Sequence, residues 1–250
     1  MYKWSGLIEN KDNDKNTYYI GDSKYYKLGH EISKESVYKQ YTYARNVIQW
    51  NIDLFMNGEK TEINLRDELT EGYNIIPNFF ISAMMAENLS FAEKIQQTDR
   101  KNKFFESYQF KNRLFDRDTL LIFHYDVNFL HVVSLYARNN EIQKQQWKDK
   151  IHNKFREEIQ NELSKKYDFY AMKEKIVGKG EEYIKSHFKD VLGKIYTPYS
   201  DKNIYSLALD KKDEYKEENK ALILELEKHF FVEKCGLGEN PEDKFRETSI

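Results

Sequence analysis

The stretch from Thr119 to Tyr125, with the sequence TLLIFHY, limits the folds open to this chain more than any other feature. It is a nearly continuous apolar run, which is typical of a β-strand that is buried on both faces. A helical pattern follows directly and extends to about Ala137, and Asp126 is the expected N-cap of that helix. The sequence therefore predicts a buried strand in a sheet with helices packed against it.

The rest of the chain also alternates between strand and helix patterns. We expect an N-terminal β-hairpin formed by residues 1–9 and 17–27, then a helix over residues 34–56 with Ser33 as its N-cap. Pro77 interrupts the next strand pattern and predicts an edge strand or a bulge there. The later elements are expected to be a long charged helix at 141–165, strands at 167–174, 195–199, 204–209 and 230–235, and helices at 181–192 and 214–228.

This alternation predicts an α/β fold, a mixed sheet flanked by helices, with a C-terminal α/β extension. A chain of 250 residues is long enough to bury a sizeable core. We expect one unit over residues 1–176 and the extension over residues 177–250, divided near Val177–Gly180. Target recognition and subunit contact are the two roles open to the extension.

Composition narrows the classes of protein that fit. The net charge of −2 argues against a uniformly basic nucleic-acid binder, although it leaves local basic patches open. The single cysteine, Cys235, excludes an internal disulfide and a cysteine-based zinc cluster. The first ten residues lack the pattern of a signal peptide, and no apolar run approaches the ~20 residues of a membrane span. We therefore expect a cytoplasmic protein that does not enter a membrane.

One acid and one base stand out in the stretch from Thr17 to Gly29, TYYIGDSKYYKLG. Alternate residues of a strand share a face, so Asp22 and Lys24 are expected on the same side. Such a pair is either a surface ion pair, which contributes little to stability, or the centre of a metal site. In a metal site, the aspartate and the carbonyl of Ser23 suit Mg²⁺, and the lysine can hold water and meet developing negative charge.

The sequence IGDSK on the second strand of a hairpin, followed by a helix carrying YKQYTYARN, resembles the PD-(D/E)XK nuclease superfamily. The order of these motifs resembles the LlaJI-type and McrC-like restriction enzymes, over about residues 1–60. The resemblance implies a restriction-endonuclease-like sheet and Mg²⁺-dependent hydrolysis of double-stranded DNA in a restriction system, with Mn²⁺ as an alternative metal. It implies that Asp22 binds the metal, that Lys24 is catalytic, and that Gln40 helps to fix the site.

The same resemblance implies partners besides DNA: a second copy of the chain in a homodimer, or a separate nucleotide-hydrolysing subunit. Neither VGKGEE nor CGLGEN has the spacing of a nucleotide-binding loop, so we expect no nucleotide site within this chain, and a nucleotide-hydrolysing motor would be a separate subunit.

The first acid of the family pattern, usually preceded by proline, has no counterpart at the expected place. One expectation is that the chain is a truncated reading frame or one part of a split enzyme. The other is that Glu9, Asp12 or Asp14 replaces the acid as a metal ligand, and Glu9 is favoured because it lies on the first predicted strand. A catalytically incomplete DNA-binding or assembly subunit is the alternative function.

Two further groups of residues are weaker candidates for a functional site. Basic residues near the aromatic stretch from Phe110 to Asp118 are candidates for gripping a DNA backbone, and a charged loop anchored by core aromatics is the alternative. These candidates are Lys101, Lys103, Lys111 and Arg113. His124, Asp126 and His131 invite a metal or general-base interpretation, beside the simpler one of a helix cap with two packed histidines.

Overall fold

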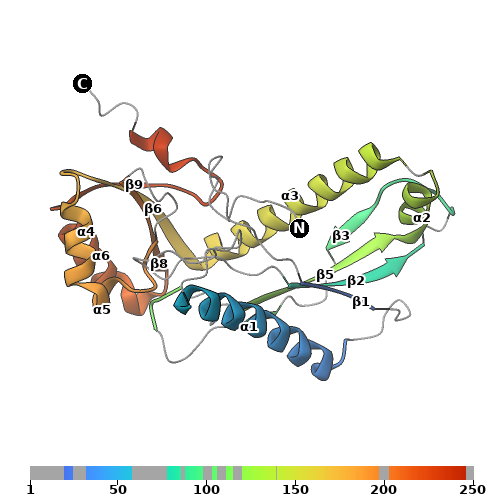
Figure 1. Cartoon of the computed structure of the whole chain (residues 1–250), viewed down its shortest axis with the longest axis horizontal. Coiled ribbons are helices and arrows are strands. Elements are labelled where there is room, and N and C mark those ends of the chain that lie inside the picture. Colours follow the sequence, from blue (N-terminus) through green and yellow to red (C-terminus); the bar gives the residue numbers. More distant parts are fainter. Residues whose placement is uncertain are drawn as a thin grey trace.

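The computed structural model shows a mixed α/β protein, as the sequence predicts, with two sheets and helices against them (Figure 1). It describes residues 20–24, 32–57, 78–85, 88–97, 103–105, 111–114, 120–138, 140–196 and 203–245.

The first sheet is built around the apolar strand that the sequence singled out. Its order is β1 (Ile20–Lys24), β2 (Asn78–Met84), β5 (Leu120–Asn128) and β3 (Ile95–Gln97), and β4 (Lys103–Phe105) also pairs with β5. The first three strands are parallel, while β3 and β4 run antiparallel to β5. Residues 121–128 of β5 are all buried, which agrees with the prediction of a strand covered on both faces.

Two expectations about this sheet are wrong. The strand after Pro77 is not at an edge, because β2 lies between β1 and β5 and pairs with both. Pro77 itself lies outside the described residues. Asp126 is not a helix cap, because β5 continues to Asn128. The Asn128 side chain accepts a hydrogen bond from the Leu130 amide and caps the helix.

Three helices accompany the first sheet: α1 (Lys34–Met56), α2 (Phe129–Ala137) and α3 (Glu141–Lys166). In Figure 1, α1 lies on one face of the sheet and α3 on the other. The Ser33 hydroxyl accepts a hydrogen bond from the Ser36 amide at 3.2 Å, so Ser33 caps α1 as predicted. The limits of α1 agree with the predicted range, and α3 ends one residue later than predicted.

The main core lies between the first sheet and α3 and continues to residues of the second sheet. The ring of Phe155 on α3 packs against Phe79 on β2 and Tyr125 on β5, with centroids 4.6 and 4.5 Å apart. Every second residue of β5, from Leu121 to Val127, belongs to this core. The opposite face of the same strand therefore points toward α1.

The second sheet is antiparallel, with the order β7 (Ile195–Tyr196), β8 (Ile204–Asp210), β6 (Tyr167–Glu174) and β9 (Phe230–Lys234). Its helical elements are α4 (Lys179–Ser186), α5 (Phe188–Val191), η1 (Asp213–Tyr215), α6 (Lys216–Leu226) and η2 (Pro241–Phe245). The predicted division between residues 176 and 177 falls within this unit, after β6. The single helix expected at 181–192 is two helices separated at His187.

The first predicted strand of the N-terminal hairpin lies outside the described residues. No helix among the residues that the structure describes is long and apolar enough to cross a membrane.

Candidate functional site

Strand β1 carries the acid–lysine pair at the outer end of the described strand order. Asp22 lies beside Phe80 of β2 in the parallel register, and position 24 lies beside Ser82. Asp22 is half-buried. Strand alternation places position 24 on the same face as Asp22.

Gln40 links helix α1 to this strand. Its side chain is fully buried, and Nε2 donates a hydrogen bond of 2.8 Å to the carbonyl oxygen of Ile20, two residues before Asp22. Within the described part of the chain, the amide oxygen of Gln40 is buried without a hydrogen-bond partner. The structure therefore brings Gln40 and the D-x-K strand together, while the role of Gln40 in a site stays a prediction.

Tyr41, the next residue of α1, is unsuited to act as a general acid or base near neutral pH. Burial, with a smaller contribution from Tyr38, raises the pKa of Tyr41 to about 12. Its phenol consequently stays protonated under ordinary conditions.

The face of the sheet toward α1 is unusually polar. On β2 and β5, the residues that alternate away from the α3 core include a buried amide, a hydroxyl, an imidazole and a carboxylate. These residues are Asn78, Ser82, His124 and Asp126. Parallel register places position 24, Ser82 and Asp126 side by side on three adjacent strands. Each strand step is about 4.8 Å, so position 24 and Asp126 are about 10 Å apart along this row.

Sequence reasoning missed this polar row because it interpreted Asp126 as a cap. The signal was nonetheless present, since polar residues recur at even spacings, and so on one face, within strands that are otherwise apolar. Asn78 and Ser82 stand four residues apart on β2, and His124 and Asp126 stand two apart on β5.

His131 does not join His124 and Asp126. It lies on α2, and its Nδ1 is 3.1 Å from the carbonyl oxygen of Phe91. His124 instead lies beside Phe80, with ring centroids 5.3 Å apart. In the described ranges, no three histidine, cysteine, aspartate or glutamate side chains gather as a group that could hold a metal ion.

The structure describes several of the predicted site residues only partly or not at all. Glu9 and Lys101 lie outside the described residues, as do Asp12 and Asp14. For Ser23, Lys24 and Lys103, the structure gives the strand position but not the side chain. Their predicted roles stay predictions.

The two remaining basic candidates differ in their surroundings. Lys111 is exposed on a turn. The guanidinium of Arg113 donates hydrogen bonds to the carbonyls of Leu192 and Lys189, the latter at 2.8 Å, and so connects this segment to the end of α5. Arg113 therefore holds two parts of the chain together, whether or not it also contacts DNA.

Arg113→Ala is expected to lower the free energy of unfolding by about 2 kcal/mol, because two carbonyls lose a charged donor. Lys111→Ala, at an exposed site, is the matched control and is expected to change it by less than about 0.5 kcal/mol. Urea denaturation of the three proteins measures both effects. Equal stability of the two variants would contradict the structural role of Arg113.

Gly21 allows β1 to lie close to the core. An added Cβ would come within 2.5 Å of the Phe79 ring, which cannot move freely because it packs on Phe155. We expect Gly21→Ala to lower the free energy of unfolding by about 1–3 kcal/mol. Gly236→Ala is the control, since its added Cβ would meet nothing closer than 3.6 Å. Similar denaturation midpoints for both variants would show that β1 does not pack as described.

Comparison of the chain with protein-family models, curated proteins and solved structures finds no match to any of them. The geometry of the site is thus the basis for the functional proposal.

Proposed function

We propose that this chain is a metal-dependent DNA endonuclease of the PD-(D/E)XK type, with β1 as its catalytic strand. Asp22 holds a divalent cation, Mg²⁺ or Mn²⁺, together with the Ser23 carbonyl. Lys24 orients water and meets the negative charge that develops on the phosphate. When bound, the cation neutralises phosphate charge and makes water a better nucleophile.

The observation that carries this proposal is the hydrogen bond from Gln40 to the Ile20 carbonyl. A buried side chain on the following helix fixes the backbone of the strand two residues before Asp22. A catalytic carboxylate needs this kind of support, because small displacements of a reacting group greatly reduce rates.

The donor set fits a magnesium ion, which takes oxygen ligands and keeps several waters when few carboxylates are available. One half-buried carboxylate and one backbone carbonyl supply such a set. Asp126 lies on the same face of the sheet and is a further acid near the site. At about 10 Å from position 24, it is better placed to act through water than as a direct ligand.

The proposed setting is a cytoplasmic restriction system acting on double-stranded DNA. A homodimer would provide two catalytic strands for a double-strand break. A separate nucleotide-hydrolysing subunit is the other proposed partner.

Supercoiled plasmid tests the proposal. The purified chain is expected to convert it to nicked or linear DNA in Mg²⁺ or Mn²⁺, and to leave it intact with a chelator. The alternative, a DNA-binding or assembly subunit, predicts salt-dependent binding that is indifferent to Mg²⁺ and to Asp22→Ala, without cleavage. DNA binding without cleavage would replace the nuclease proposal by this alternative.

A further inference from the structure

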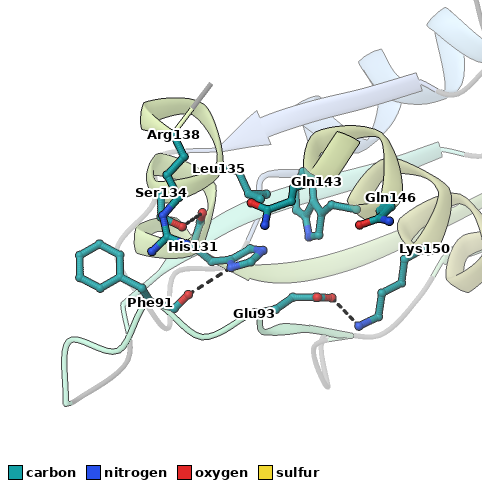
Figure 2. A pocket seen from close by; sticks show the side chains of 10 residues that line it. Phe91, Glu93, His131, Ser134, Leu135, Arg138, Gln143, Gln146 and Lys150 are labelled. Carbon is teal, nitrogen blue, oxygen red and sulfur yellow. Dashed lines mark hydrogen bonds and ion pairs between the residues drawn. The ribbon is translucent and has the colours of Figure 1, made fainter. Parts of the chain in front are cut away.

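A separate cavity of about 350 Å³ lies between α2, α3 and the segment that precedes β3 (Figure 2). This volume is within the range of small-molecule sites. In the strand order, β3 and β1 are at opposite ends, so the cavity is not part of the D-x-K site.

His131 is one of the residues that line this cavity. Its Nδ1 contacts the Phe91 carbonyl at 3.1 Å, drawn as a dashed line in Figure 2. A carbonyl oxygen only accepts, so Nδ1 carries the proton, and in the corresponding neutral tautomer Nε2 is an acceptor. Within the described part of the chain, that Nε2 is buried and has no partner.

Trp147 presents the complementary group. Its Nε1–H can only donate, and it too is buried without a partner among the described residues. The rings of His131 and Trp147 are 6.0 Å apart between centroids and line the same cavity. One unsatisfied acceptor and one unsatisfied donor are costly to bury, and both would be satisfied by a ligand that offers the opposite pair.

The charge at the cavity favours an anion. Lys150 and Glu93 pair at 2.8 Å and cancel each other, as Figure 2 shows. Arg138 also lines the cavity, and no carboxylate pairs with its guanidinium within the described ranges. A guanidinium left without a partner is a good group for binding phosphate.

We propose that this cavity binds a nucleoside monophosphate. The edge of a nucleobase carries adjacent donors and acceptors, which match His131 Nε2 and the Trp147 indole N–H. The planar ring suits the aromatic lining, which includes Phe91, and the phosphate pairs with Arg138. A free nucleotide and a nucleotide unit at the end of a DNA strand share this chemistry, and we propose the free nucleotide as the occupant.

Isothermal titration calorimetry without divalent metal tests this site independently of DNA cleavage. The probes are the four deoxynucleoside 5′-monophosphates, inorganic phosphate, deoxyadenosine and a short single-stranded oligonucleotide. We expect at least one monophosphate to bind with a dissociation constant below about 1 mM, and phosphate or nucleoside alone to bind at least about tenfold more weakly. Tighter binding of the oligonucleotide than of any monophosphate would overturn the choice of occupant.

Trp147→Phe keeps a ring but removes the donor, and Arg138→Gln removes the charge. Each is expected to weaken binding by at least about tenfold. Gln145→Ala is the control, because Gln145 is exposed on α3 and its Nε2 donates to Asp149. Unchanged affinity in folded Trp147→Phe and Arg138→Gln variants would overturn the proposal.

The indole N–H resonance of Trp147 supplies a measurement on the unaltered protein. The chain has three tryptophans, and the signal absent from Trp147→Phe identifies the one at the cavity. We expect the bound monophosphate to shift this resonance while the other two stay in place. A ligand that binds without moving the Trp147 signal occupies another site and contradicts the assignment.

Discussion

Replacing Asp22 by asparagine is expected to lower the rate of Mg²⁺-dependent DNA cleavage by about 10³-fold or more. A cation held at this position would contribute several kcal/mol to the transition state, and each 1.36 kcal/mol corresponds to a factor of ten in rate. Asparagine keeps the size of the side chain but removes the negative charge that attracts the metal. The cleavage rate of both proteins on the same plasmid, at saturating Mg²⁺, measures the effect.

The loss should not come from unfolding. Asp22 is half-buried at the outer end of the described strand order, so we expect its replacement to change the unfolding midpoint little. Asp190→Asn, at an exposed position on α5, is the matched control and should cleave at the wild-type rate. If Asp22→Asn cleaves as fast as this control, Asp22 is not the metal ligand.

The largest expected effect on stability is at Glu174, the last residue of β6. This buried carboxylate accepts hydrogen bonds from the amides of Gly178 and Glu181, at 2.6 and 2.8 Å, and from the Tyr205 hydroxyl at 3.0 Å. It thereby joins β6 to the first turn of α4 and to the neighbouring strand β8. Glu174→Ala removes the acceptor of three hydrogen bonds, and we expect the free energy of unfolding to fall by about 3–5 kcal/mol.

Tyr205→Phe provides the comparison, because it removes one of these donors together with its hydrogen bond. We expect it to lower the free energy of unfolding by about 1 kcal/mol. In the Glu174→Ala background, the same change should cost less, because the hydroxyl has already lost its acceptor. Strict additivity of the two changes in urea denaturation would mean that the Glu174 network does not form.

The helices and strands with strong local patterns were predictable from the sequence. Helix α1 and strand β6 have the predicted limits, and α3 differs by one residue. Each has an extended periodic pattern or a clear change of pattern at its ends. Asp126 was misassigned because aspartate is a good N-cap, while the adjacent strand continues through Asn128 and uses that residue instead.

The pairing between strands was harder to predict from the sequence, because it depends on contacts between residues far apart in the chain. Pro77 suggested an edge strand, yet the strand begins just beyond it and pairs on both sides. The same register creates the row that joins position 24, Ser82 and Asp126, which no local motif contains. In the candidate site, the sequence correctly anticipated a strand at Asp22, and the structure added the buried hydrogen bond from Gln40.

The central claim is that β1 is a catalytic strand, and Lys24→Ala tests it most directly. Supercoiled plasmid is incubated with the wild-type chain and with the variant in Mg²⁺, at equal concentrations and with matched circular dichroism spectra. We expect nicking by the wild type and a cleavage rate lower by about 10²-fold or more in the variant, as for other groups that stabilise developing charge. Metal-dependent cleavage at the same rate in both proteins would contradict it.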